Sequence, residues 1–103
     1  MSSYELLKRA ILSKEQVTAT YESNLRQFCP HALGWKNGEE HCLGYQFGGQ
    51  STTGPIVPGS PHNWRCFAVA KLHGVTIHAG DWHSCGTHGG PTNCLERIDV
   101  EVS

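Results

Sequence analysis

The segment NWRCFAVAKL, residues 63–72, places two cations in a run that is otherwise mostly apolar. Residues two apart in a β-strand lie on one face, so Arg65 and Lys71 would share a face with the apolar side chains between them. The pattern predicts a strand with a buried middle and cationic ends at the rim of the domain. Two interpretations fit such ends: they bind an anionic ligand, or they extend into solvent and bind nothing specific.

A second group of reactive side chains lies near the C-terminus, in WHSCGTHGGPTNC (82–94). It contains four potential zinc ligands, namely His83, Cys85, His88 and Cys94. Structural zinc takes four nitrogen or sulfur donors, so this set predicts a metal staple for a small domain. Its spacing matches no common zinc finger. The alternatives are that the histidines cap backbone groups of the loop, or that Cys85 and Cys94 form a disulfide.

Catalysis has the least support in the sequence. A Cys–His nucleophile pair would be a third hypothesis, because both residue types are abundant. However, no helix N-terminus follows a cysteine to lower the pKa of its thiol. No stretch resembles a phosphate-binding or dinucleotide-binding glycine loop. We therefore predict a non-catalytic protein.

The length and charge of the chain set the class of protein. With 103 residues we expect one small domain over 1–103. Its net charge is −1 with histidine neutral, so no overall field attracts a nucleic-acid backbone, and such binding would need a local patch. No apolar run reaches the roughly 18 residues that span a bilayer, and the N-terminus does not resemble a signal peptide. We therefore expect a cytoplasmic protein without a membrane partner.

The cytoplasmic expectation also bears on the five cysteines. In a reducing compartment they should be thiols or metal ligands. Cys29, Cys42 and Cys66 lie in strand-like contexts, where we expect them to act as small buried hydrophobes.

The elements that must position these residues follow from the pattern along the chain. Ser2-x-x-Glu5 is a capping box and predicts a helix over 3–13. Asn37-Gly38 favours a tight hairpin turn, and Pro30 should lie at an edge, a bulge or a bend. Strands are predicted at 16–21, 25–35, 41–47, 63–72, 74–79 and 95–102. A long loop at 48–62 separates the third strand from the fourth, and a barrel is the economical way to close so many edges.

Several of these residues together resemble the WYL-domain family. Arg26, Pro30 and Leu33 are similar to its first conserved strand, with Tyr21 in the preceding strand. HCLGY (41–45) falls where the family has its Trp-Tyr-Leu signature, although His41 and Cys42 replace the first two residues. RCFAVAKL (65–72) resembles its Arg-x-Phe-x-x-x-Arg-Ile segment, with Ala68 and Lys71 at two basic positions. The resemblance covers roughly residues 5–78.

The resemblance implies a mainly β fold, a small SH3/Sm-like β-barrel of five to six strands with one N-terminal helix. The barrel would occupy 16–80, and the His/Cys-rich loop and last strand 81–103. In that family the barrel is a regulatory module that binds nucleic acid or nucleotide-like ligands through basic residues. Carried over by position, the anion-contacting residues would be Arg26, Arg65 and Lys71. Tyr45 and Trp64 could offer stacking surfaces to bases, or they could be core residues.

The leading hypothesis is therefore a binding module that recognises a nucleotide or short nucleic acid through basic residues at strand ends. The alternative, from another class, is a zinc-stapled structural or protein-interaction domain. Exposed strand edges also make a homodimer plausible.

Overall fold

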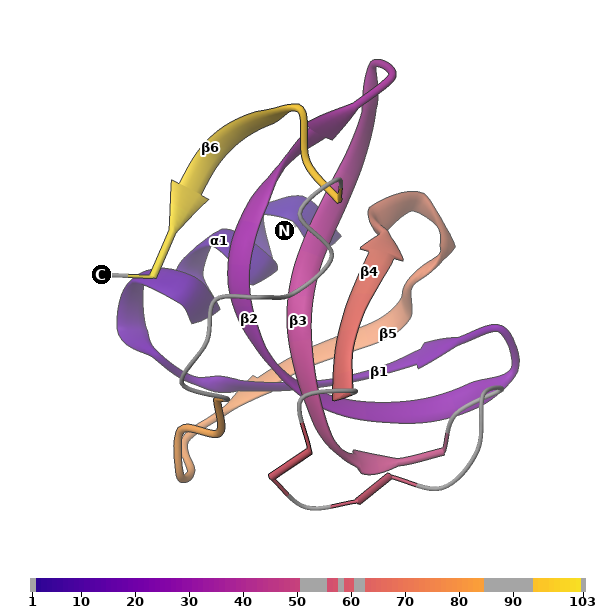
Figure 1. Ribbon diagram of the computed structural model, residues 1–103, viewed down its shortest axis with the longest axis vertical. Coiled ribbons are helices and arrows are strands. Elements are labelled where there is room, and N and C mark those ends of the chain that lie inside the picture. Colours follow the sequence, from indigo (N-terminus) through magenta and orange to yellow (C-terminus); the bar gives the residue numbers. More distant parts are fainter. Residues whose placement is uncertain (1, 51–55, 58, 61–62, 85–93, 103) are drawn as a thin grey trace.

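The computed structural model describes residues 2–50, 56–57, 59–60, 63–84 and 94–102. The fold is mainly β, with one N-terminal helix and a six-stranded antiparallel sheet (Figure 1). The elements are α1 (Ser3–Ser13), β1 (Gln16–Tyr21), β2 (Asn24–Lys36), β3 (Glu39–Gly49), β4 (Trp64–Ala68), the 3₁₀ turn η2 (Val69–Lys71), β5 (His73–His78) and β6 (Arg97–Glu101). The strand order is β4-β3-β2-β1-β5, and β6 pairs with β2.

Helix α1 covers the residues that the capping box predicts. The Ser2 hydroxyl accepts a hydrogen bond from the Glu5 amide at 3.1 Å, which satisfies one amide of the first turn. The helix ends at Lys14, whose φ of 53° is left-handed. Its buried side chains are Leu7, Ala10 and Ile11. Their spacing puts them on one stripe, which packs against the sheet.

Strand β2 is long and bent, and it organises the sheet. Its first part pairs with β1 and its last part, Ala32–Trp35, pairs with β6, while β3 runs along its other edge. Its register against β3 shifts after Gln27 and again after Pro30, as expected for bulges that bend a strand. The bend is visible in Figure 1, where β1 and β5 cross below the upper part of β2 and β3. Pro30 therefore lies at a bulge, one of its predicted positions.

The predicted closed barrel is not what the described residues form. β4 pairs with β3 and β5 pairs with β1, but no ladder joins these two edge strands in the described part of the chain. The strand predicted at 63–72 ends at Ala68, and η2 then turns the chain toward β5. At the end of β4, the Ala68 amide donates to the Tyr21 hydroxyl at 3.2 Å. The contact between the ends of β4 and β1 is thus made by a side chain and not by a backbone ladder.

The main core lies between α1 and the sheet. The rings of Phe28 and Phe67 lie 4.5 Å apart, and Tyr21 meets Phe67 edge-on at 5.0 Å. Gly44 makes this packing possible, because a Cβ there would lie 2.6 Å from the Phe28 ring. The buried set is Leu7, Ala10, Ile11, Val17, Ala19, Phe28, Leu33, Cys42, Phe67, Val69 and Leu72. In the described part of the chain, no helix has the length and apolar character needed to cross a membrane.

The predicted turn at Asn37-Gly38 is present, and both residues have positive φ, 53° and 77°. Such angles belong to the tight hairpin turns that match strand twist. The turn joins β2 to β3 and fixes the register that positions the candidate site.

Replacing Gly34 with alanine should weaken the attachment of β6. A Cβ at Gly34 would lie 1.8 Å from the Arg97 carbonyl oxygen, which is backbone and must move. We expect the free energy of unfolding to fall by about 2 kcal/mol, the usual range for overpacking. Chemical denaturation measures it. Gly48→Ala is the matched control, because the three atoms nearest to its Cβ would all belong to the Gln27 side chain, whose amide end can move. Equal losses for the two variants would contradict this explanation.

Candidate functional site

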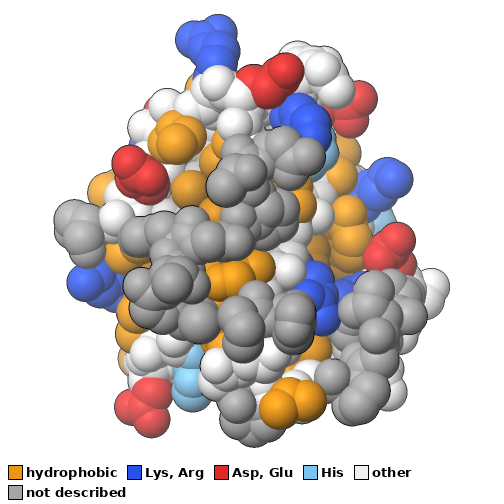
Figure 2. Space-filling view, viewed as in Figure 1, with side chains coloured by type: hydrophobic (Ala, Val, Ile, Leu, Met, Phe, Trp, Pro, Cys, Tyr) orange, Lys and Arg blue, Asp and Glu red, His pale blue; other side chains and the backbone are white. Residues whose placement is uncertain are grey.

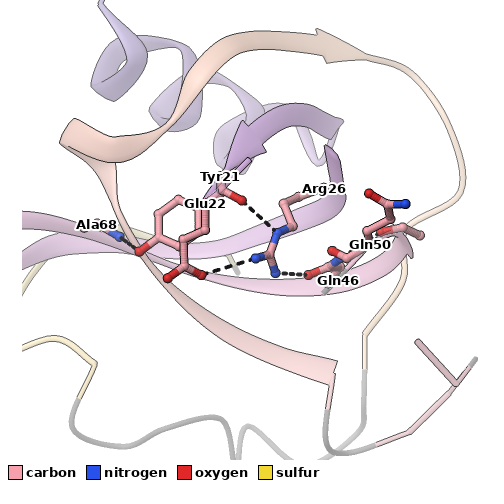
Figure 3. A network of polar contacts seen from close by, with 7 residues as sticks. Tyr21, Glu22, Arg26, Gln46, Gln50 and Ala68 are labelled. Atoms are coloured by element: carbon pink, nitrogen blue, oxygen red, sulfur yellow. Dashed lines mark hydrogen bonds and ion pairs between the residues drawn. The ribbon is translucent and has the colours of Figure 1, made fainter. Parts of the chain in front are cut away.

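The first predicted anion-contacting residue, Arg26, lies in a buried polar network. Its side chain is 2% exposed. The guanidinium donates to the Tyr21 carbonyl at 3.4 Å, the Gln46 Oε1 at 3.3 Å and the Glu22 Oε1 at 3.3 Å (Figure 3). Gln46 is also fully buried and donates to the carbonyls of Gly48 and Gln50, each at 2.9 Å. Arg26 therefore ties the β1–β2 turn to the end of β3.

This placement leaves Arg26 little surface for direct contact with a ligand. Its charge still matters, because Glu22 is the one carboxylate with which it forms a described ion pair, and the Glu22 side chain is 54% exposed. An ion pair with an exposed partner is screened by water. Arg26 is thus a fixed positive charge beneath this end of the sheet.

Arg65 lies on the same side of the sheet. It pairs with Gly44 on β3, and Phe67, two residues along β4, points into the core. Its Nη1 donates to the Trp64 carbonyl at 3.0 Å, and its side chain is half-buried. Burial, and after it the positive charge of Arg26, lowers the pKa of Arg65. The charge of Arg26 therefore disfavours the charged form of Arg65, although burial disfavours it more.

The third predicted residue, Lys71, does not share a strand face with Arg65. It lies in η2 beyond the end of β4, and it is exposed. The prediction that Arg65 and Lys71 share a strand face is wrong, because the extended segment stops at Ala68. Lys71 is not part of the Arg26–Arg65 group in this structure.

The two aromatic residues proposed for base stacking are buried on the opposite face of the sheet. Tyr45 is 1% exposed and Trp64 is 6% exposed, and their rings meet edge-on at 5.1 Å. The Tyr45 hydroxyl donates to the Ser60 carbonyl at 2.7 Å. Neither ring lies open to a base, and the pair belongs to a second, smaller core.

This second core also contains a buried histidine, His31. The His31 ring lies 4.7 Å from Trp64 and 4.9 Å from Trp82, measured between ring centroids. His83, proposed as a zinc ligand, stacks on Phe47 at 4.3 Å. Its amide donates to the Cys29 thiol at 3.3 Å, which holds the chain after β5 against β2 and β3. In the sequence, a histidine within the mostly apolar segment 25–35 is the feature that could have indicated this second core.

Two of the cysteines differ from the expectation of free thiols or metal ligands. Cys66 and Cys94, 28 residues apart, form a disulfide that joins β4 to the segment before β6. In this form Cys94 has no thiolate for a metal. Cys85 and His88, the other two proposed ligands besides His83, lie outside the described residues. Over the described ranges, no group of three or more His, Cys, Asp or Glu residues could hold a metal ion.

Cys29 and Cys42 are buried thiols, as predicted. Burial raises the pKa of both thiols above the ordinary value. Because the thiolate is the nucleophilic form, this environment suits structural cysteines and not a cysteine nucleophile.

Charged side chains are dispersed over the face in Figure 2, where Lys and Arg alternate with Asp and Glu. The described side chains of that face form no broad basic patch of the kind that tracks a long nucleic-acid backbone. The local feature is the pair Arg26 and Arg65. Searches of family models, of curated proteins and of solved structures each found no significant match to this chain.

Proposed function

We propose that this chain is a binding module for a small phosphate-bearing ligand, a nucleotide, which Arg65 contacts directly. The observation that carries the proposal is the placement of Arg26 and Arg65 on one side of the sheet, where burial, and after it the positive charge of Arg26, lowers the pKa of Arg65. Two like charges held together at a partly buried site disfavour each other, and an anion between or above them relieves the repulsion. In a chain of net charge −1, such a pair is a local exception.

The roles of the two arginines differ. Arg26 is fixed by the Tyr21 carbonyl, Glu22 and Gln46, so it supplies a preorganised positive potential from below. Arg65 is half-buried and exposes more of its surface than Arg26 does. A planar guanidinium donates two parallel hydrogen bonds to phosphate, which suits it to this contact.

A nucleotide fits better than a long nucleic acid. One contacting guanidinium, Arg65, with the buried charge of Arg26 behind it, matches one or two phosphates. Tyr45 and Trp64 are too buried to stack with successive bases. Short nucleic acid, the other ligand suggested by the sequence, would show a steep loss of affinity with salt because several counterions are released. A shallow salt dependence is what the nucleotide proposal requires.

We retain as proposals the WYL-like relationship, the SH3/Sm-like character of the fold and a regulatory role. The cytoplasmic placement has an observation against it, since the Cys66–Cys94 disulfide is more typical of oxidising compartments. The homodimer stays a prediction.

Replacing Arg65 with alanine should weaken ATP binding roughly 10- to 100-fold, as expected for a charge-assisted hydrogen bond of about 1.5–3 kcal/mol. The melting temperature should change by no more than about 3 °C, because the lost contacts are offset by relief of the repulsion from Arg26. Isothermal titration calorimetry measures the first quantity and circular dichroism the second. Lys71→Ala is the matched control and should bind as the unmodified protein does. An Arg65→Ala variant that binds ATP normally would refute the site.

A stapled structural or interaction domain is the second candidate, and the disulfide is the observation that favours it. In that case the C-terminal segment is attached by Cys66–Cys94 and not by zinc. A metal chelator should then leave the melting temperature unchanged, whereas a zinc staple through His83 and Cys85 would make it fall sharply.

A further inference from the structure

His31 lies in the second core with both ring nitrogens in short polar contacts. Its Nδ1 is 2.7 Å from the Cys29 carbonyl oxygen, and its Nε2 is 3.0 Å from the Ser84 hydroxyl. His31 is 2% exposed, whereas Ser84 is exposed. The exposed residue Ser84 thus contacts a buried imidazole through its hydroxyl.

The chemistry of the partners fixes the protons of this group. A carbonyl oxygen only accepts hydrogen bonds, so Nδ1 carries the hydrogen and donates it to Cys29. In the neutral ring Nε2 is then an acceptor, and the Ser84 hydroxyl must donate to it. The proton of Ser84 already points at a base, and the backbone of β2 holds that base in one tautomer.

Aromatic rings pack around the base. The Trp64 and Trp82 rings lie 4.7 and 4.9 Å from the His31 ring, measured between centroids, and this packing fixes the orientation of the imidazole. The Trp64 Nε1 is also buried and has no acceptor among the described residues. A buried N–H without an acceptor costs about 1–3 kcal/mol.

We propose that Ser84 is a nucleophile activated by His31, and that it takes an acyl or phosphonyl group from an activated ester. The arrangement has the three parts that define such a site: a nucleophile, a base within hydrogen-bond reach and a third group that orients the base. It lies on the sheet face opposite Arg65 and is independent of the nucleotide proposal.

The step balances without a cofactor. The Ser84 Oγ attacks the electrophilic carbon or phosphorus while its proton moves to His31 Nε2. The bond to the leaving group breaks, and the leaving group departs with the bonding electron pair. His31 then returns its proton to the leaving group or to water. The product is an ester of Ser84.

A fluorophosphonate probe tests this proposal on the intact, oxidised chain. The Oγ–phosphorus bond forms, the phosphorus–fluorine bond breaks and fluoride leaves. Peptide mapping by mass spectrometry locates the adduct. We expect modification of Ser84 at a rate about 100-fold above that of Ser13, the lower range for general-base catalysis. Ser13 is the internal control, because its hydroxyl hydrogen-bonds to the Arg9 carbonyl and the Glu15 carboxylate instead of an imidazole.

Two variants separate activation from simple exposure. Ser84→Ala should abolish the adduct, and His31→Gln, which preserves hydrogen bonding but removes the base, should reduce the rate to that of Ser13. The proposal is overturned if Ser84 reacts no faster than Ser13 in the unmodified chain, or if folded His31→Gln reacts as fast as the unmodified chain. The first comparison needs no variant, so it decides the question even if His31→Gln does not fold.

Discussion

Arg26→Ala is expected to lower the free energy of unfolding by about 4 kcal/mol. The substitution leaves a cavity at a 2% exposed position and removes the donors to the Gln46 amide oxygen and the Tyr21 carbonyl. Cavities of this kind cost about 2–5 kcal/mol, and each unsatisfied buried acceptor adds about 1–3 kcal/mol when water cannot enter. Urea denaturation followed by circular dichroism measures the change. For a small domain this is a large part of the total stability.

Arg97→Ala is the matched control for this variant. Arg97 is exposed, and its guanidinium lies 5.5 Å above the centroid of the Trp35 ring. An exposed contact of this type contributes about 0.5–1 kcal/mol, so the loss should be several times smaller. If Arg26→Ala and Arg97→Ala unfold at the same urea concentration, Arg26 is not a structural cation. Arg26 would then be available to contact a ligand, as the sequence resemblance implied.

Reduction of the Cys66–Cys94 disulfide is expected to lower the free energy of unfolding by about 3.5 kcal/mol. The bridge closes a loop with a sequence separation of 28, and the chain-entropy relation gives about this value for a loop of that size. The bridge also holds the segment that leads to β6, so we expect β6 to separate from β2 more readily. Thermal denaturation with and without a phosphine reductant measures the loss.

The double variant Cys66→Ser/Cys94→Ser provides the control for this experiment. It should show the reduced stability without reductant and should not respond to further reduction. Cys29 and Cys42 are buried thiols with raised pKa, so they should not exchange with the bridge. A reduced chain as stable as the oxidised one would show that the bridge does not constrain the fold.

The local elements were predictable because their signals are short-range. The Ser2 cap, the Asn37-Gly38 turn and the bulge at Pro30 each depend on residues that are neighbours in the sequence. The end of β4 was not predicted, because a buried apolar residue such as Val69 fits a 3₁₀ turn as well as a strand. Closure of a barrel would require β4 and β5 to pair with each other. These strands are at opposite ends of the strand order, and no local sequence pattern shows whether they pair.

The candidate site was predicted only in part. Arg65 was correctly singled out as a cation on a core strand, but the burial of Arg26 depends on Gln46, 20 residues away on β3. The disulfide joins residues that the sequence placed in different elements, and several pairings of five cysteines were equally possible. The second core was not predicted, because its parts come from β2, β3, β4 and the segment after β5.

A titration of the ¹⁵N-labelled protein with ATP, followed by backbone amide shifts in NMR spectra, tests the central proposal most directly. We expect saturable shifts that concentrate on Arg65, on its partner Gly44 and on the neighbouring amides of Arg26 and Gln46. The amide of Lys71 should move little, and the Arg65→Ala variant should lose the response. Shifts scattered over exposed lysines, or none at millimolar ATP, would contradict a nucleotide site at Arg65.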